Sequence, residues 1–149
     1  MTREMTLAID CGGGGIKGSV VDERGTMMAP ARRVPTPYPL PPELLVETAV
    51  GLAKELPPAT RVTMGMPGMI RHGVVIATPH YITRDGPRSR VLPELVERWD
   101  HFDMGRAIEQ ALGLPTKVLN DAEVAGAGAI TGRGLEMIIT LGTGLGNAV

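Results

Sequence analysis

Two glycine-rich turns, each directly after a short apolar run, constrain the fold of this chain most strongly. Residues 5–10 lead into Cys11-Gly12-Gly13-Gly14-Gly15, and residues 136–140 lead into Leu141-Gly142-Thr143-Gly144-Leu145-Gly146. Glycine lets the backbone approach a ligand closely and turn its N–H groups toward an anion. Each turn alone is also compatible with an ordinary β-hairpin. Together the two strand–glycine units predict a sheet whose turns cradle phosphate groups.

The first turn is flanked by two residues of opposite charge, Asp10 and Lys17. Asp10 is a candidate ligand for hydrated Mg²⁺, because this ion binds through one or two carboxylates together with substrate phosphates. Lys17 is a candidate partner for a phosphate oxygen, and a surface lysine on a hairpin is the alternative. The turn lacks the Gly-Lys-Ser/Thr ending of a Walker A loop. It is not a dinucleotide fingerprint either, since the third glycine of that motif would fall at Lys17.

Between the two glycine turns, another predicted strand ends in polar residues. Residues 117–119 are predicted to form a buried strand that ends at Asn120-Asp121, and small residues then predict a helix over 122–130. A carboxylate at such a junction has a backbone fixed by the sheet and a side chain that can face a cleft. The alternative is that Asp121 or Asn120 only caps the helix, and the sequence leaves both open.

The rest of the chain alternates between strand and helix patterns, which predicts an α/β structure with a mixed sheet in the order βββαβαβα. Pro30 predicts an edge strand or a break in the third strand. The predicted segments are strands over 16–22, 26–34 and 61–66, extended residues at 69–70 and 73–77, and helices over 43–56, 92–99 and from an Asp103 N-cap to 112.

Composition excludes several functional classes. The 149 residues carry a net charge of -1, with 15 lysines and arginines against 16 acidic residues, so neither a nucleic-acid surface nor a polybasic membrane anchor is expected. No apolar run has membrane-spanning length, and the N-terminal apolar run is too short for a signal peptide. Cys11 is the only cysteine, which excludes an intramolecular disulfide and is predicted to be a small buried hydrophobe. A cytoplasmic location is expected.

Four motifs in order resemble the ROK family of sugar kinases, which belongs to the actin-like, ribonuclease-H-fold ATPase superfamily. The motifs are Asp10-x-Gly-Gly-x-x-Ile-Lys-Gly18, Gly65-x-Pro67-Gly68, Asn120-Asp121-Ala122 and Leu141-Gly-Thr-Gly-x-Gly146. Val118-Leu119-Asn120-Asp121-Ala122 and His72-Gly73-Val74-Val75 are most similar to the polyphosphate glucokinase branch. The resemblance implies phosphoryl transfer from ATP or polyphosphate to a hexose, with glucose expected, and Mg²⁺ as cofactor.

The resemblance also implies roles for individual residues. Asp121 resembles the general base that takes the proton of a sugar hydroxyl, and Asn120 resembles a sugar ligand beside it. His80 follows Pro79 where the family often has asparagine, and is expected to hydrogen-bond the sugar. The remaining implied roles are a sugar-pocket wall at Gly65, Pro67 and Gly68, a first phosphate loop at Asp10, Gly12, Gly13 and Lys17 with Asp10 at the metal, and a second phosphate loop at Gly142, Thr143 and Gly144.

The chain departs from the family pattern in two main ways. Gly14 stands where the family usually has threonine or serine, so one hydroxyl contact to phosphate is lost. Family members are roughly twice as long, so residues 1–133 are expected to form an N-terminal lobe and residues 134–149 the start of a second lobe. The isolated chain is expected to be inactive or partly active. The histidines and Cys11 show no zinc-site spacing.

Alternatives to a kinase remain at this stage. A sugar-sensing regulator is disfavoured because the first strand begins near Met5, which leaves no room for a helix-turn-helix, and because Asp121 is retained. A catalytically silent sugar-binding or regulatory member of the same family remains open. The family is often dimeric, so a homodimer is a candidate assembly.

Overall fold

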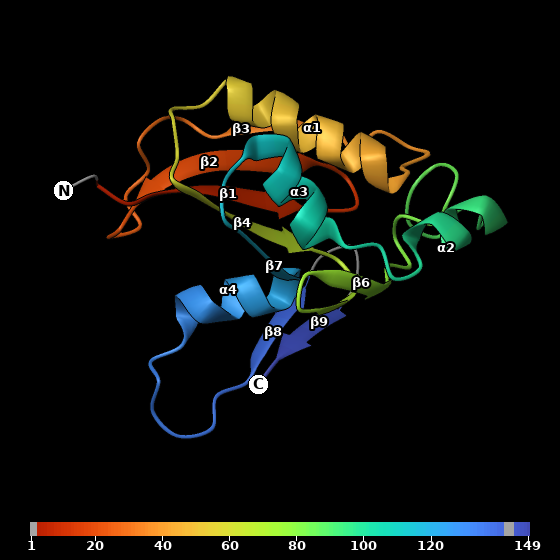
Figure 1. The fold of residues 1–149 in the computed structure, drawn as a ribbon. Helices are drawn as coiled ribbons and strands as arrows, with labels where there is room; N and C mark the ends of the chain where they lie inside the picture. Colours follow the sequence, from red (N-terminus) through yellow and green to blue (C-terminus); the bar gives the residue numbers. More distant parts are fainter. Residues whose placement is uncertain (1–2, 142–144) are drawn as a thin grey trace.

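The computed structural model describes residues 3–141 and 145–149 (Figure 1). Its centre is a five-stranded mixed sheet in the order β3-β2-β1-β4-β7. β1 pairs with β2 and β2 with β3 in antiparallel fashion, whereas β1, β4 and β7 run parallel. The strands of this sheet are β1 (Met5–Cys11), β2 (Ile16–Asp22), β3 (Arg32–Val34), β4 (Arg61–Met66) and β7 (Thr116–Asn120).

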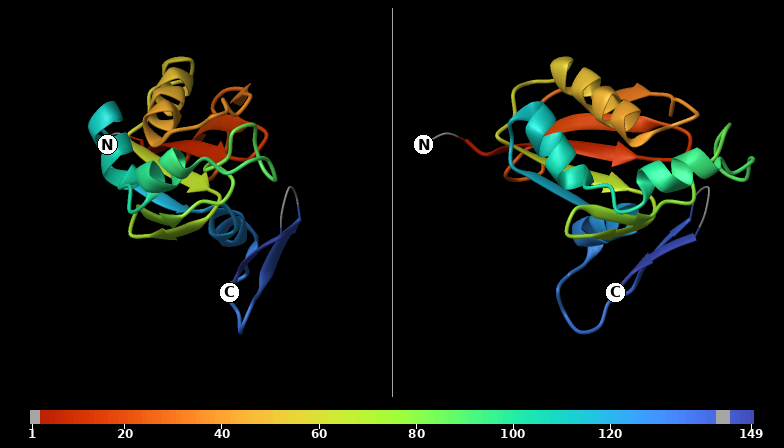
Figure 2. Two further views of the ribbon diagram at one scale, coloured as in Figure 1. Left: turned by 90° about the vertical axis from the view of Figure 1, so that its right-hand side faces the viewer. Right: turned by 45° about the vertical axis from the view of Figure 1, so that its right-hand side comes forward.

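Helices cover both faces of the sheet (Figure 2). On one face, α1 (Pro42–Lys54) and α3 (Met104–Leu112) enclose the core with buried side chains from alternate positions of β1 and β4. Among these core residues are Ile9, Met64, Leu45, Ala49 and Ile108. α4 (Asp121–Ala129) lies on the opposite face, because a Cβ added at Gly65 of β4 would contact Val124 of α4, whereas one at Gly18 of β2 would contact Leu56, just after α1.

The helix ends follow local chemistry. α1 begins at Pro42, where a fixed φ and a missing N–H are tolerated, and it ends before Pro57-Pro58. Asp103 caps α3 by accepting a hydrogen bond from the Arg106 N–H at 2.9 Å, as predicted. Gly113 ends the same helix with a φ of 66°, in the left-handed region that favours glycine.

The third strand is much shorter than predicted. Residues 26–34 are predicted as one strand that Pro30 either confines to an edge or breaks; β3 covers only Arg32–Val34, at the edge of the sheet, and Met27 contributes one isolated bridge to Val21. Pro30 lies between these two pairings and cannot donate a ladder hydrogen bond, so the predicted break occurs there.

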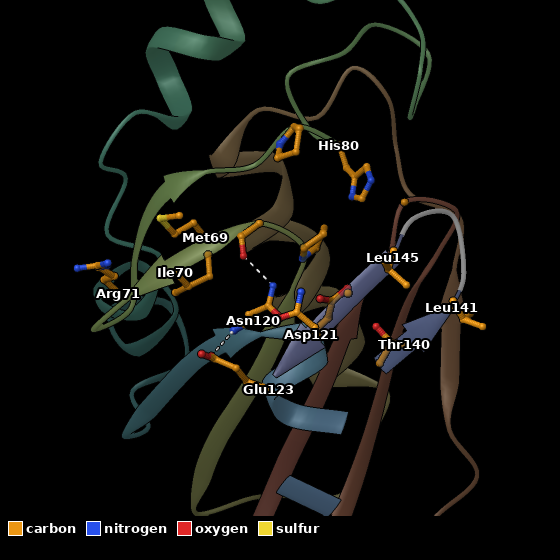
Figure 3. Close-up of a pocket in the computed structure, with 17 residues that line it drawn as sticks. Met69, Ile70, Arg71, His80, Asn120, Asp121, Glu123, Thr140, Leu141 and Leu145 are labelled. Carbon is orange, nitrogen blue, oxygen red and sulfur yellow. Dashed lines mark hydrogen bonds between the residues drawn. The ribbon is translucent and has the colours of Figure 1, made fainter. Parts of the chain in front are cut away.

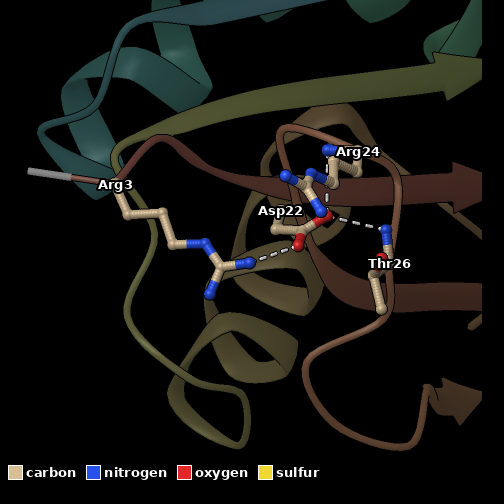
Figure 4. Close-up of polar contacts among 4 residues, drawn as sticks. All are labelled: Arg3, Asp22, Arg24 and Thr26. Atoms are coloured by element: carbon tan, nitrogen blue, oxygen red, sulfur yellow. Dashed lines mark hydrogen bonds and ion pairs between the residues drawn. The ribbon is translucent and has the colours of Figure 1, made fainter.

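The far end of β2, away from the glycine turn, is closed by one carboxylate (Figure 4). Asp22 is buried and accepts hydrogen bonds from the N–H groups of Arg24 and Thr26 at 2.9 and 2.8 Å, and it pairs with the Arg3 guanidinium. The amide of Thr26, followed by that of Arg24 and the Arg3 charge, lowers the pKa of Asp22 below its ordinary value. The turn after β2 is therefore held by an ionised side chain.

Two hairpins and one short helix complete the fold. β5 (Met69–Arg71) and β6 (Val74–Ala77) form a hairpin whose turn residues His72 and Gly73 both have positive φ. α2 (Pro93–Trp99) follows an irregular segment. β8 (Ile138–Leu141) and β9 (Leu145–Ala148) form a second hairpin that packs on α4. Among the described residues, no helix combines the length and apolar character needed to cross a membrane.

Candidate active site

The three parallel strands place their carboxyl ends at one edge of the sheet. Asp10 of β1 is paired with Gly65 of β4, and Met66 of β4 is paired with Asn120 of β7. The residues that follow these positions are the first glycine turn, Pro67-Gly68 and Asp121. Parallel pairing therefore brings together three motifs that lie about 55 residues apart along the chain.

Asn120 caps α4, so the Asp121 carboxylate takes part in only one of the hydrogen bonds at the helix start. The Asn120 Oδ1 accepts a hydrogen bond from the Ala122 N–H at 2.9 Å, and Glu123 accepts one from the Asn120 N–H at 3.1 Å, which completes a capping box. Asp121 Oδ1 also accepts from Ala122 N–H at 2.9 Å. Its Oδ2 accepts no hydrogen bond from the residues that the structure describes. Within the described part of the chain, one oxygen of this carboxylate therefore has no protein donor.

Asn120 also ties the helix start to the turn after β4. Its Nδ2 donates a hydrogen bond to the Gly68 carbonyl at 2.7 Å (Figure 3). Gly68 has a φ of 119°, and a Cβ there would lie only 2.1 Å from the carbonyl oxygen of Ala77. Thr78 donates to the Pro67 carbonyl at 3.0 Å. The Pro67-Gly68 turn is thus fixed from both sides, and only glycine fits its second position.

A cleft of about 900 Å³ opens at this edge of the sheet (Figure 3). Its floor and walls contain most of the residues predicted to act on sugar and donor, together with residues that were given no such role. The predicted residues in its lining are Gly12, Gly13, Pro67, Gly68, His80, Asn120 and Asp121, and the others are Met69, Ile70, Arg71, Pro79, Glu123, Thr140, Leu141, Leu145, Gly146 and Asn147.

Three predicted residues lie outside this lining. Gly65 is buried beneath α4, where an added Cβ would lie 3.2 Å from Val124 and 3.5 Å from the Asp121 Cα. Its lack of a side chain lets the start of α4 approach β4, so Gly65 positions Asp121 without forming the cleft wall. Asp10 and Lys17 are exposed and form an ion pair at 3.9 Å. Gly142, Thr143 and Gly144 lie outside the described residues.

Asp10 has the chemistry expected of a magnesium ligand of the hydrated type. Its carboxylate is 66% exposed, and only Cys11 separates Asp10 from the glycine loop 12–15. Within the described residues, no group of three or more histidine, cysteine or acidic side chains forms a cage for a metal. Mg²⁺ needs no such cage, because it retains waters and shares its remaining coordination between one or two carboxylates and substrate phosphates. Asp10 therefore fits Mg²⁺ that arrives with a phosphorylated donor.

His80 contributes an unsatisfied polar atom. Its Nδ1 is buried and has no hydrogen-bond partner among the described residues. A buried polar atom without a partner is energetically costly, by about 1–3 kcal/mol. His80 also lines the cleft, but a ligand there could reach the buried Nδ1 only after the ring turns.

Cys11 does not participate as a nucleophile. The side chain is fully buried, and burial, followed by the negative charges of Asp10 and Asp121, raises the pKa of the thiol far above its ordinary value. The thiol therefore stays protonated and inert at neutral pH. The prediction of a small buried hydrophobe at this position is confirmed.

Comparison with known sequences gives a consistent family signal. The family model described as "ROK family" matches residues 6–149. An N-acetylmannosamine kinase of Escherichia coli (strain SE11) is 33% identical over 150 residues, which cover 97% of this chain and 46% of that protein. The chain thus spans about half the length of the curated relatives it matches.

Solved structures agree with this signal. An inorganic polyphosphate/ATP-glucomannokinase from Arthrobacter sp. strain KM matches with a TM-score of 0.77 at 32% identity, covering 97% of this chain and 57% of that one. A ROK family glucokinase from Streptomyces griseus, in complex with glucose and AMPPNP, matches with a TM-score of 0.72 at 30% identity, covering 96% and 43%. These matches confirm the predicted fold class, an α/β domain of the actin-like ATPase type with a mixed sheet.

Proposed function

Because this chain belongs to the ROK family, we propose that it carries the sugar-binding and catalytic side of a sugar kinase. The reaction is transfer of a phosphoryl group from ATP or polyphosphate to a hydroxyl of a hexose. In this proposal residues 1–133 form the lobe that holds the sugar, and residues 134–149 begin a second lobe at the donor.

One observation carries the proposal: the Asp121 carboxylate and the first two glycines of the loop, Gly12 and Gly13, line the same cleft. Phosphoryl transfer requires an in-line arrangement, neutralisation of phosphate charge and one carboxylate at the attacking hydroxyl. Asp121 accepts the hydroxyl proton, a new P–O bond forms to the sugar oxygen, and the bond to the donor's leaving phosphate breaks. In this proposal the second N–H of Asn120 Nδ2 and the His80 imidazole orient the sugar, which is supported by their position in the cleft lining.

The donor side is proposed to use backbone amides and two charged residues. Gly12 and Gly13 line the cleft, and Lys17 offers a positive charge for a phosphate oxygen. When Mg²⁺ is bound it neutralises donor charge, and Asp10 is the side chain of this chain that would hold it. In the same proposal, Gly142, Thr143 and Gly144 contact the donor from the other side.

Glucose is the hexose we propose, with N-acetylmannosamine as the competing substrate. Glucose is supported by similarity to the glucomannokinase and the glucokinase, at 32% and 30% identity. The 33% identity to N-acetylmannosamine kinases supports the competitor. A coupled assay with glucose, mannose and N-acetylmannosamine, each with ATP and with polyphosphate, separates these substrates and donors.

The role of Asp121 is tested by Asp121→Asn. We expect turnover to fall by about 10²- to 10⁴-fold, since the general base is removed while the size of the side chain is kept. Glucose affinity by calorimetry should change little. Asp85→Asn is the matched control, because Asp85 is exposed, pairs with Arg84 and lies outside the cleft. Activity of Asp121→Asn equal to that of Asp85→Asn and of an active wild-type protein would refute the assignment of the base.

Gly14 favours one second candidate, a silent sugar-binding member of the family. A Cβ added at Gly14 would meet nothing within 4 Å, so a threonine fits there without rearrangement. If the chain binds sugar without turnover, Gly14→Thr tests whether the missing hydroxyl is the cause. Turnover that appears in Gly14→Thr would support a kinase weakened at the donor loop, and its continued absence would favour the silent binder.

A further inference from the structure

Two tyrosines and one threonine lie directly behind the glycine loop 12–15. Thr36 Oγ1 donates a hydrogen bond to the Gly12 carbonyl at 2.8 Å, and the Tyr38 hydroxyl donates to the Gly13 carbonyl at 3.0 Å. The Tyr81 hydroxyl also reaches the Gly12 carbonyl, at 3.4 Å. None of these three residues lines the cleft, whereas Gly12 and Gly13 do. The hydroxyls therefore hold the loop from the side away from the cleft.

Because peptide bonds are planar, the contacts to the loop carbonyls also fix the direction of the neighbouring loop N–H groups. In a trans peptide the C=O of one residue and the N–H of the next point in opposite directions. A Gly12 carbonyl held by Thr36 and Tyr81 thus directs the Gly13 N–H away from the hydroxyls. The Gly13 carbonyl, held by Tyr38, does the same for the Gly14 N–H. Neither amide donates a hydrogen bond within the part of the chain that the structure describes.

The three hydroxyls are themselves fixed by the core. Tyr81 is buried and packs against Trp99 in a tilted arrangement at a ring-centroid distance of 5.6 Å, and Trp99 contacts Phe102 edge-on at 6.1 Å. The Trp99 Nε1 donates to the Leu40 carbonyl at 2.9 Å, which anchors the segment that carries Thr36 and Tyr38. Gly86 lies against the Tyr38 ring, where an added Cβ would be 3.3 Å from the ring edge.

We propose that Thr36, Tyr38 and Tyr81 are positioning residues that present the Gly13 and Gly14 amides to a phosphate group of the donor. A run of four glycines has no intrinsic preference for one conformation, so the loop requires outside contacts to keep its amides aligned. Burial raises the pKa of Tyr38 to about 12 and raises that of Tyr81 well above its ordinary value, which keeps both hydroxyls protonated donors. This inference rests on the function proposed above.

The test removes one hydroxyl at a time, with Thr36→Val, Tyr38→Phe and Tyr81→Phe. The probe is tripolyphosphate with Mg²⁺, titrated by calorimetry and followed through the Gly13 and Gly14 amide signals in ¹⁵N NMR spectra. We expect each variant to bind tripolyphosphate about three- to tenfold more weakly, the effect of one hydrogen bond. Glucose affinity, measured in parallel, should stay at the wild-type value. Thr48→Val is the matched control, because Thr48 donates to the Leu44 carbonyl within α1 at 2.7 Å.

The outcomes separate this proposal from the proposed function. Wild-type tripolyphosphate affinity in all three variants would overturn the positioning role and leave the kinase assignment intact. An equal loss of affinity for glucose and tripolyphosphate would also overturn it, since that is the result of general loosening. If the wild-type chain gives no amide shifts with tripolyphosphate yet binds glucose, the donor role of this loop is refuted together with its positioning residues.

Discussion

The two sides of the cleft are built differently. The side formed by β1, β4 and β7 emerges from the main core, where Met64 and the neighbouring side chains are fully buried. The side formed by the β8–β9 hairpin exposes its large apolar residues, and Leu141 and Leu145 are 84% and 71% exposed. This hairpin contacts the rest of the chain through small residues of α4, where an added Cβ at Gly126 would meet Ile138 at 3.2 Å.

This difference shows which parts of the cleft are held in position by the core. Asp121, Asn120 and the glycine loop 12–15 inherit their positions from strands that the core holds in register. The hairpin packs on a single helix and presents apolar side chains to solvent. Groups that must meet reacting atoms within fractions of an ångström are expected on the first kind of support. The predictions below test this contrast, from the largest expected effect to the smallest.

The largest effect is expected from Met64→Ala in β4. Met64 is fully buried between the sheet and its helices, so truncation leaves a cavity and lowers the free energy of unfolding by about 2–5 kcal/mol. Urea denaturation measures the change. A loss below 1 kcal/mol would mean that the sheet side is no better anchored than the hairpin.

Gly68→Ala is expected to have the next largest effect. The new Cβ would clash with the Ala77 carbonyl, and the φ of 119° is itself unfavourable for alanine, so we expect a loss of about 2–4 kcal/mol and weaker sugar binding. Gly113→Ala is the matched control, because Gly113 also has positive φ but open space around it. Its cost should be about 1–2 kcal/mol. Equal costs would show that the turn after β4 relaxes freely.

Asp22→Asn tests the sheet side of the cleft through the loss of folding stability at acidic pH. The pKa of Asp22 is lower in the folded protein than its unfolded value of about 3.9, so its stabilisation is complete above that value and is lost as the pH falls toward the folded pKa. The variant should be less stable at pH 7 and lose less stability between pH 5 and pH 3. Urea midpoints across that pH range measure the loss of stability.

Glu136→Gln is the comparison from the hairpin side, since Glu136 holds the preceding loop and its pKa is also lowered, first by the Thr131 amide. Parallel pH profiles for wild type and Asp22→Asn would contradict the expectation.

The smallest effect is expected from Met137→Ala, which repeats the Met64 change just before β8. Met137 is 62% exposed, so the free energy of unfolding should change by less than about 0.5 kcal/mol. The same urea denaturation provides the measurement. A loss comparable to that of Met64→Ala would remove the contrast between the two sides of the cleft.

Local patterns were sufficient to predict much of the fold. The apolar runs of β1, β2 and β4, the Asp103 cap and the Gly113 helix end each depend on residues close in sequence. The third strand was predicted too long, because β-propensity in residues 26–34 does not reveal which residues find a pairing partner. The competition between Asn120 and Asp121 for the cap was undecidable from the sequence, since either side chain fits that position.

The site was predictable where it follows strand ends and unpredictable elsewhere. Gly12, Pro67 and Asp121 meet because parallel strands share an edge, which the alternation of strands and helices implies. The contribution of the β5–β6 hairpin through Ile70 and Arg71 has no local signal. The hydroxyl contacts to the glycine loop also have no local sequence signal, because they join residues 24 to 69 positions apart.

The contact between the Trp99 and Tyr81 rings gives the molecule a built-in optical probe. Trp99 is the only tryptophan of the chain, it is buried, and the Tyr81 ring that it contacts ends in the hydroxyl that touches the Gly12 carbonyl. Fluorescence excited in the band that tryptophan absorbs and tyrosine does not therefore comes from one emitter, two contacts away from the glycine loop. In a stopped-flow instrument, that emission would time the arrival of a ligand at the loop separately from any later chemical step.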